Sequence, residues 1–205
     1  CGWGGFAEHA ARLGVAVHGI TISDAQLDFA RRRLVNEPLA ILEHRDYRDL
    51  SGQYDAIVSI EMFEAVGERY WRGYFDTLRR CLKPGGQALA QSITIEESRF
   101  ETYRANADFI QTFIFPGGML PSRERFLRAA RQGGLACRGR LDFGPDYAET
   151  LRRWRDAFEA NLAAIRSQGF DEAFIRLWRL YLCYCEAGFD EGRIGVSQFL
   201  LQRHA

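Results

Sequence analysis

Strand-like and helix-like segments alternate along the first 95 residues, and this alternation constrains the fold more than any other feature. Short apolar segments predict strands, and the amphipathic segments between them predict helices. Parallel neighbours need a crossover connection, which is usually a helix. The alternation therefore predicts an α/β, Rossmann-like fold with a mostly parallel sheet. The predicted strands are 16–22, 39–46, 54–63 and 87–95; the predicted helices are 23–34, capped by Ser23 or Asp24, and 69–82, followed by a turn at 83–86.

The second half of the chain is organised differently. A loop, IFPGGMLPS (114–122), precedes a predicted helix at 123–132, a strand near 135–143, helices at about 147–168 and 171–187, and a final strand at 192–203. No internal repeat or low-complexity tract interrupts it. We predict one domain, residues 1–205, with a helical insertion between late strands that forms a cap over the site.

The glycine-rich turn CGWGG occupies residues 1–5. In a doubly wound fold such a turn follows the first strand, which lies in the middle of the sheet. A central strand pairs on both edges, so its loss leaves two neighbours with unpaired backbone. We therefore expect the chain to be a fragment of a protein that continues upstream, with the first strand missing from the fragment.

Composition argues against several classes of function. Lys and Arg together number 27, as do Asp and Glu, so a strongly basic surface for nucleic acid is not favoured. No apolar run reaches the roughly 18 residues of a membrane span, and no signal peptide is seen. The five cysteines lack zinc-type spacing and are interpreted as reduced, mostly buried thiols of a cytoplasmic protein. The four histidines form no site by spacing, and we predict no metal.

Polar residues follow the ends of the predicted strands: Thr21 and Gln26, the segment RDYRDL (45–50), and Glu61 with Glu64. Ligands of doubly wound folds bind outside the carboxyl ends of the strands, where these residues and the glycine-rich turn converge. Glycines let backbone amides approach a cofactor closely, although an ordinary left-handed turn explains a lone motif about equally well. The turn is not G-x-G-x-x-G, so a cofactor without phosphates fits better.

With these segments in order, the chain resembles the cyclopropane fatty acid synthase family, which includes the mycolic acid cyclopropane synthases. The similarity is colinear and covers essentially all of the chain. Two of its motifs, FxxVG after the third predicted strand and the loop IFPGG-x-LPS, are specific to this family among methyltransferases. The matching pieces are CGWGG (1–5), GITISDAQ (19–26), RDYRDL (45–50), SIEMFEAVGERYWRGYF (59–75), LKPGGQALAQSITI (82–95), FIFPGGMLPS (113–122) and FGPDYAETLRRW (143–154).

The resemblance implies a class I methyltransferase fold, an S-adenosyl-L-methionine site and a bicarbonate ion as catalytic base. It implies bicarbonate ligands at Glu64, at the backbone of Ile93 and at Tyr147, and a family cysteine upstream of the turn. Gln91 stands where many members carry histidine, and its NH₂ group can hold the bicarbonate in place of an imidazole donor. The residues matching the cofactor site are Gly2, Gly4, Thr21, Gln26, Asp46, Tyr47, Arg48 and Ile60.

A second departure from the family pattern is SIEM at residues 59–62, where many members have SxGM. The pattern is similar to that of a subgroup whose members add a methyl or methylene branch rather than a ring. The product is therefore left open between a cyclopropane and a branch, and Gln91 favours the branch.

Methyl transfer to an alkene leaves a carbocation on the acyl chain. The site must then exclude water and supply a weak base, and aromatic faces stabilise the cation. Each candidate has a simpler structural explanation: an N-cap or surface position for Glu64, capping or packing for Tyr147, a satisfied buried amide for Gln91, and a small buried hydrophobe for Cys185, which matches a family cysteine. The aromatic candidates, for most of which core packing is the favoured role, are Phe63, Tyr70, Trp71, Tyr74, Phe109, Phe113, Phe115 and Tyr147.

The expected substrate is an unsaturated phospholipid acyl chain in a hydrophobic tunnel, reached by peripheral contact of a cytoplasmic protein with the inner membrane surface. Arginines in helices 123–131 and 152–155 fit anionic headgroups or a solvated helix face equally well. Homodimer formation is left open. Two other hypotheses compete: a methyltransferase for small amines with the same fold, and a catalytically inactive fragment that only binds lipid or cofactor.

Overall fold

The computed structural model describes residues 1–203, which form two compact units. The first unit is Cys1–Gln53 and the second begins at Tyr54. Each unit has its own sheet, of two strands in the first and of four in the second. The single domain inferred from the sequence stays a prediction, as does the additional strand upstream of the glycine-rich turn.

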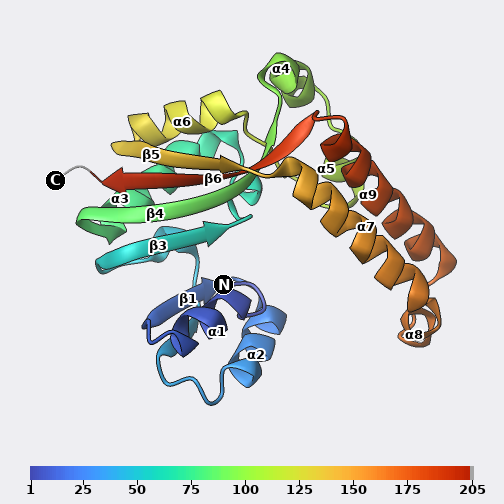
Figure 1. The fold of residues 1–205 in the computed structure, drawn as a ribbon, viewed down its shortest axis with the longest axis horizontal. Coiled ribbons are helices and arrows are strands. Elements are labelled where there is room, and N and C mark those ends of the chain that lie inside the picture. The colour runs from blue at the N-terminus through green and yellow to red at the C-terminus, as the bar shows by residue number, and fades with distance from the viewer. Residues whose placement is uncertain (204–205) are drawn as a thin grey trace. The chain divides into compact units, whose positions relative to one another are not determined.

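The first unit contains two parallel strands, β1 (Val17–Thr21) and β2 (Ala40–His44). Helix α1 (Gly5–Arg12) precedes β1, and α2 (Asp24–Arg33) connects the two strands (Figure 1). Ser23 is the N-cap of α2, because its hydroxyl accepts a hydrogen bond from the Gln26 N–H at 3.3 Å. The strand–helix–strand arrangement predicted for this part is confirmed.

The second unit begins with β3 (Tyr54–Ile60), which pairs in parallel with β4 (Leu82–Ile95). Helix α3 (Trp71–Cys81) lies between these two strands in the sequence. The sheet order is β3-β4-β6-β5. β6 (Ile194–Arg203) is antiparallel both to β4 and to β5 (Leu135–Asp142). Strands β3, β4 and β5 therefore run in one direction and only β6 is reversed, so the predicted mostly parallel sheet is confirmed.

The segment KPGG (83–86), predicted as a turn, lies inside the span of β4. The register moves from Tyr54 opposite Leu82 to Ala56 opposite Gln87, so these four residues bulge out of the ladder. Gly85 has φ +73°, and a Cβ at Gly86 would lie 2.9 Å from the carbonyl oxygen of Lys83. The turn chemistry was recognised correctly, but it produces a bulge within a strand rather than a break between helix and strand.

Helices supply the rest of the second unit (Figure 1). Two short helices, α4 and α5, were not predicted, whereas α6 matches the prediction for 123–132. The predicted helix 147–168 is divided at Asn161 into α7 and α8, and the helix predicted at 171–187 extends to Asp190. The bounds are α4 (Glu97–Ala105), α5 (Phe109–Phe113), α6 (Arg123–Gln132), α7 (Gly144–Ala160), α8 (Leu162–Ser167) and α9 (Glu172–Asp190).

Aromatic rings form the core where α3 and α6 pack on the four-stranded sheet. Phe126 of α6 is fully buried and stacks on Phe199 of β6, with ring centroids 4.1 Å apart. Phe63 and Phe75 meet the same ring edge-on at 4.9 and 5.1 Å. Such pairs are favourable beyond the area they bury. This cluster fixes Phe63, and with it the turn that carries Glu64.

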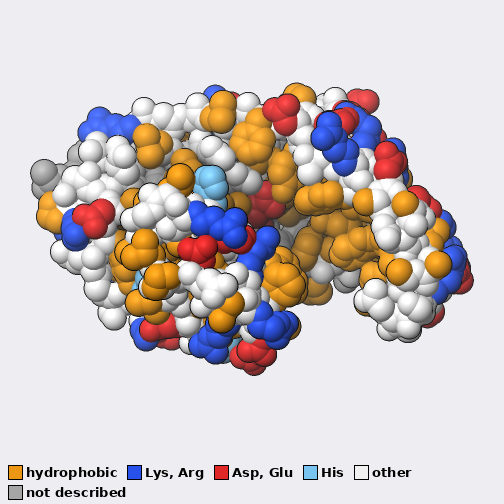
Figure 2. Space-filling view, turned by 60° about the horizontal axis from the view of Figure 1, so that its bottom comes forward, with side chains coloured by type: hydrophobic (Ala, Val, Ile, Leu, Met, Phe, Trp, Pro, Cys, Tyr) orange, Lys and Arg blue, Asp and Glu red, His pale blue; other side chains and the backbone are white. Residues whose placement is uncertain are grey.

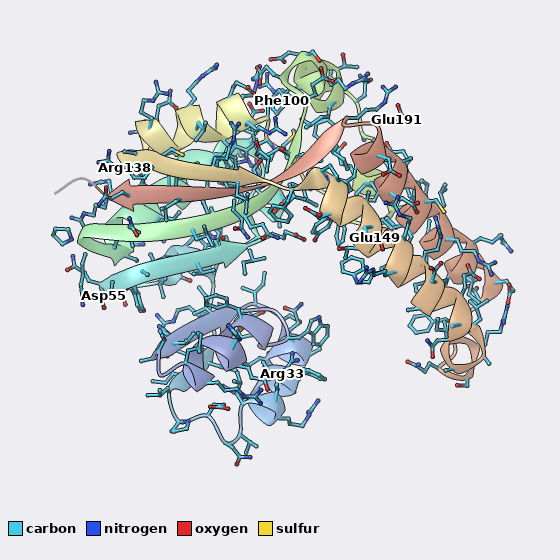
Figure 3. All side chains as sticks on the ribbon, in the orientation of Figure 1. Arg33, Asp55, Phe100, Arg138, Glu149 and Glu191 are labelled. Carbon is cyan, nitrogen blue, oxygen red and sulfur yellow. The ribbon has the colours of Figure 1, made fainter. Side chains whose placement is uncertain are left out.

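Helices α7 and α9 pack against each other and are joined by ion pairs. Arg152 lies 2.9 Å from Asp190, and Arg155 pairs with Glu186. Glu149, labelled on α7 in Figure 3, holds Arg152 and Arg153 at 3.1 and 2.9 Å. These pairs support the helix-face explanation for the arginines at 152–155 over headgroup binding.

Two other findings bear on the expectations from composition. Among the described residues no helix is both long enough and apolar enough to cross a membrane. The cysteines are free thiols, but only Cys81 is buried, Cys185 is partly buried, and Cys1, Cys137 and Cys183 are exposed. The expectation of mostly buried thiols was therefore wrong.

Candidate active site

A cavity of about 1340 Å³ lies in the second unit, where the end of β4, the segment 98–120 and helices α7 and α9 meet. Its wall is largely apolar and aromatic, and it includes the carboxyl groups of Glu61 and Glu64, which follow the end of β3. Figure 2 shows hydrophobic side chains gathered along the helices at the right of the view. Apolar and aromatic side chains of the wall include Ile93, Ile95, Ile110, Ile114, Phe115, Met119, Leu120, Tyr147, Leu151, Trp154, Tyr181, Phe189 and Ile194.

Glu61 is the centre of a hydrogen-bond network at this wall. It follows the last residue of β3, and its N–H donates to the Gln91 carbonyl oxygen at 2.9 Å. Its Oε1 accepts hydrogen bonds from the Tyr147 hydroxyl and from Gln91 Nε2, the latter at 2.9 Å. Gln91 Oε1 in turn accepts from Gln198 Nε2 at 2.9 Å. Gln91 is thus a satisfied amide whose donor points at a carboxylate.

Glu64 lies in the 3₁₀ turn η2 (Phe63–Ala65), three residues after Glu61. Its Oε1 accepts the Ile93 N–H at 2.6 Å, whereas its buried Oε2 has no hydrogen-bond partner among the described residues. Burial raises the pKa of Glu64 to about 7, and the nearby Glu61 charge acts in the same direction. The surface and N-cap explanations for Glu64 are therefore excluded.

The loop IFPGG-x-LPS is held against the Glu64 turn. The Met119 N–H donates to the Glu64 carbonyl oxygen at 2.8 Å. At Gly118 a Cβ would lie 3.1 Å from the Phe115 carbonyl oxygen, so a larger residue would strain this approach. The family-specific loop thereby places Phe115 and Met119 on the cavity wall beside Glu64.

Tyr147 reaches Glu61 from the first turns of α7. Its ring packs on Phe189 at a centroid distance of 5.1 Å, so its position is fixed by packing as well as by its hydroxyl. Burial, and then the hydrogen bond to Glu61, raise the pKa of Tyr147, so the phenol stays protonated and donates. The resemblance gives Tyr147 a hydrogen bond to bicarbonate, which stays a prediction; in this structure the hydroxyl donates to Glu61.

The predicted aromatic lining is only partly correct. Phe63, Trp71 and Tyr74 are 1%, 5% and 1% exposed and belong to the core. This agrees with core packing, which was the favoured role for most of the aromatic candidates. Of the eight candidates, Phe115 and Tyr147 line the cavity. Five aromatic wall residues were missed. Those on α7 and α9 depend on the pairing of these helices, which is not visible in the sequence, and the fifth lies on α4, which was not predicted. They are Trp154, Tyr181, Tyr184 and Phe189 on α7 and α9, and Tyr103 on α4.

Cys185 also lies on the cavity wall. Burial raises the pKa of its thiol to about 12, so the thiol stays protonated at neutral pH. Burial likewise raises the pKa of Tyr181 to about 12. The interpretation of Cys185 as a small hydrophobic side chain fits this environment.

The residues expected to bind the cofactor lie in the first unit, apart from Ile60 at the end of β3 in the second. Thr21 ends β1; its hydroxyl donates to Gln26 Oε1 at 3.2 Å and accepts from the Ser23 N–H at 3.1 Å. The Thr21 carbonyl oxygen accepts from the Arg45 N–H at 2.9 Å, which places the start of RDYRDL beside the end of β1. The two strand ends converge within the unit as the sequence predicted.

Asp46 and Arg48 form a bidentate ion pair just after the end of β2. The Asp46 carboxylate caps the 3₁₀ turn η1 (Tyr47–Asp49) by accepting the Arg48 N–H at 2.9 Å. It also accepts the Arg48 Nε and Nη2 donors at 2.9 and 2.7 Å, and these bonds lower the pKa of Asp46. A bidentate pair of this kind holds the turn in one shape.

The two candidate glycines of the opening turn both have positive φ, +52° at Gly2 and +82° at Gly4. Gly4 has no room for a side chain, because a Cβ there would lie 3.0 Å from the Ala30 Cβ of α2. At Gly2 nothing lies within 4 Å of such a Cβ. Gly4 therefore serves helix packing, and Gly2 leaves its backbone open to a ligand.

We expect Gly4→Ala to lower the free energy of unfolding of the first unit by about 2 kcal/mol, through its left-handed backbone and its contact with Ala30. Gly14→Ala is the matched control: its φ is +81°, but nothing lies within 4 Å of an added Cβ, so about 1 kcal/mol is expected. Hydrogen exchange of the β1 and β2 amides measures both. Equal losses at the two sites would show that the Ala30 contact has no cost.

The fold of the chain is that of S-adenosylmethionine-dependent methyltransferases. A solved mycolic acid cyclopropane synthase, crystallised with SAH and CTAB, has a TM-score of 0.91 to this chain at 29% identity, covering 99% of this chain and 75% of that one. A family model described as mycolic acid cyclopropane synthetase matches residues 1–199. The chain belongs to this family.

Two curated relatives agree with the family assignment. The tuberculostearic acid methyltransferase of Mycobacterium tuberculosis is 42% identical, with 98% of this chain and 48% of the relative covered. The cyclopropane-fatty-acyl-phospholipid synthase of Escherichia coli is 35% identical, with 99% and 52% covered. The chain thus spans about half the length of the curated relatives it matches.

Proposed function

We propose that the protein is an S-adenosylmethionine-dependent C-methyltransferase that acts on the double bond of an unsaturated fatty acyl chain, giving a cyclopropane or a methyl or methylene branch. The observation that carries the proposal is the large apolar cavity with two carboxylates at one wall. Its volume of about 1340 Å³ exceeds the roughly 300–1,000 Å³ of ordinary small-molecule pockets. A long acyl chain needs such a space, and a small amine does not.

The first unit fits the proposed cofactor. Gly2 has an open backbone in the left-handed region, and Thr21 and Gln26 present polar groups at the end of β1. We propose that these residues hold S-adenosylmethionine together with Gly4, Asp46, Tyr47, Arg48 and Ile60. The bound cofactor supplies an electrophilic methyl group.

In the second unit, the proposed catalytic wall consists of Glu64, Gln91, Ile93 and Tyr147. The Ile93 N–H fixes Glu64, and the donors of Gln91 and Tyr147 converge on one oxygen of Glu61. The apolar lining keeps water from the reacting carbons, since water would trap a carbocation. We propose that the acyl chains belong to phospholipids, which the protein reaches by peripheral contact with the inner membrane surface from the cytoplasm.

The donor set does not fit the bicarbonate ion that the resemblance implies. Both side-chain donors expected to bind the ion, Tyr147 and Gln91, already donate to Glu61. The carboxylate that accepts these two donors, Glu61, repels an anion. No step of the proposed reaction therefore uses bicarbonate.

Lipid analysis of a host that expresses the protein tests the proposal. We expect fatty acyl chains that gain the mass of one methylene group, and methyl-labelled methionine should carry its label into them. A ring survives mild hydrogenation unchanged, whereas a methylene branch takes up two hydrogens. A saturated methyl branch, which needs a reductant after methyl transfer, is two hydrogens heavier than either and also survives. Retention-time standards separate ring from branch. The amine alternative is favoured instead if the purified protein methylates free amines and leaves phospholipid vesicles unmodified.

A further inference from the structure

The backbone at Glu61 is unusual for its residue type. Glu61 has φ +49° and is the one non-glycine residue with positive φ in the described part of the chain. This conformation is strained for an L-residue, because its Cβ comes too close to the backbone, whereas glycine adopts it freely. Glycine would fit this position without strain, yet the chain has a glutamate there, so the fold holds a strained backbone that carries a side chain. Strained residues of this kind concentrate at functional sites.

The Glu61 carboxylate takes both of the donors that the resemblance gives to bicarbonate. Tyr147 approaches from α7 and Gln91 from β4, and both donate to Oε1. Gln198 holds Gln91 in the orientation that presents its NH₂ group. The side chain lines the cavity, so its carboxylate faces the space proposed for the acyl chain. The Glu61 carboxylate, which belongs to the chain, therefore lies where the resemblance placed a bicarbonate ion.

We propose that Glu61 is the catalytic base of the methylation reaction, in place of bicarbonate. This inference rests on the proposed function and adds the identity of the proton acceptor. Gln91 and Tyr147 are positioning residues for Glu61, because both donate to its Oε1. Glu64 is the companion carboxyl; burial raises its pKa to about 7, so its protonated form adds no second negative charge beside Glu61.

The step balances without an oxidant or reductant. The alkene π pair forms the new bond to the methyl carbon, and the pair of the broken carbon–sulfur bond stays on sulfur. The neighbouring alkene carbon becomes a carbocation, and Glu61 then accepts a proton from the new methyl group. The released C–H pair closes a cyclopropane, or forms a methylene double bond if a hydride has first moved to the cationic carbon. Glu61 returns its proton to solvent when the product leaves.

Two substitutions at Glu61 test the effect of its carboxylate charge apart from the effect of its backbone conformation. Glu61→Gln keeps the shape and removes the charge; we expect turnover to fall ~10²-fold, with products that carry a hydroxyl group where water has trapped the cation. Glu61→Gly suits the positive φ and frees Tyr147 and Gln91 to bind an anion. We expect this variant to depend on added bicarbonate and to recover at least about tenfold with it. Glu124→Gln, an exposed change on α6, is the matched control and should behave as wild type.

Carbonate-free buffer and ¹³C-labelled bicarbonate complete the test. Wild-type turnover should be unchanged when bicarbonate is removed, and NMR should detect bicarbonate binding to Glu61→Gly but not to wild type. The proposal is overturned if wild type needs bicarbonate, if wild type binds it as well as the glycine variant does, or if Glu61→Gln keeps full activity. The binding comparison requires no turnover, so it separates a failure here from a failure of the proposed function.

Discussion

Replacement of Phe126 by alanine is expected to lower the free energy of unfolding of the second unit by about 4 kcal/mol. Phe126 is fully buried, stacks on Phe199, and meets Phe63 and Phe75 edge-on. The substitution removes the ring that joins α6 to the sheet, and a close-packed core relaxes only partly into the space left behind. Few single changes in a domain cost this much.

Urea unfolding followed by tryptophan fluorescence measures the effect, because the Trp71 ring lies 5.3 Å from Phe63 and reports on the cluster. Phe113→Ala is the matched control. Its side chain is 63% exposed, so the same chemical change should cost no more than about 1 kcal/mol. A loss below about 2 kcal/mol at Phe126 would mean that the aromatic cluster is not the main support of this sheet.

The strands and most helices could be predicted because each has a local pattern. Apolar runs, the Ser23 cap and the glycines near residue 85 all act within a few positions. The place of β6 between β4 and β5 could not be predicted, because it depends on pairs such as Gln91 with Gln198, which are 107 positions apart. Helix α5 was missed because its five residues are too few to show a helical period.

The residues of the candidate site that could be predicted from the sequence are those that the family resemblance named. Glu64, Ile93, Gln91 and Tyr147 are brought together by the fold. The sequence places Glu61 among the polar strand ends that converge at the ligand site and marks it as a departure from SxGM, but it assigns Glu61 no catalytic or binding role. Its importance follows from its positive φ and from two converging donors, and both arise only from the tertiary structure.

Stability should respond to pH through Glu64 in a direction that can be worked out from its pKa. The carboxyl titrates near 4.5 in the unfolded chain and near 7 in the folded protein, where burial disfavours the charge. Below about pH 4.5 both states are protonated. Between about pH 4.5 and 7 only the folded state retains the proton, so the stabilising contribution is lost as the pH rises through the folded value. At about 1.4 kcal/mol per unit, the loss is about 3 kcal/mol.

Glu64→Gln isolates this effect, because an amide keeps the size and an acceptor for the Ile93 N–H but does not titrate. We expect the free energy of unfolding of the variant, minus that of wild type, to rise by about 3 kcal/mol between pH 4.5 and pH 8. Groups whose pKa is lowered, such as Asp46, titrate in both proteins and cancel in the difference. Chemical denaturation at a series of pH values measures it, with Glu124→Gln as the exposed control.

Parallel pH profiles for wild type and Glu64→Gln would contradict the raised pKa. The Glu64 carboxyl would then be ionised in the fold, and two adjacent negative charges would face the cavity at neutral pH. Diverging profiles would instead mean that the site holds a proton on Glu64 near neutrality, beside the Glu61 oxygen that accepts the Tyr147 and Gln91 hydrogen bonds. The division of roles between the two carboxyls can thus be tested by stability alone, without substrate or cofactor.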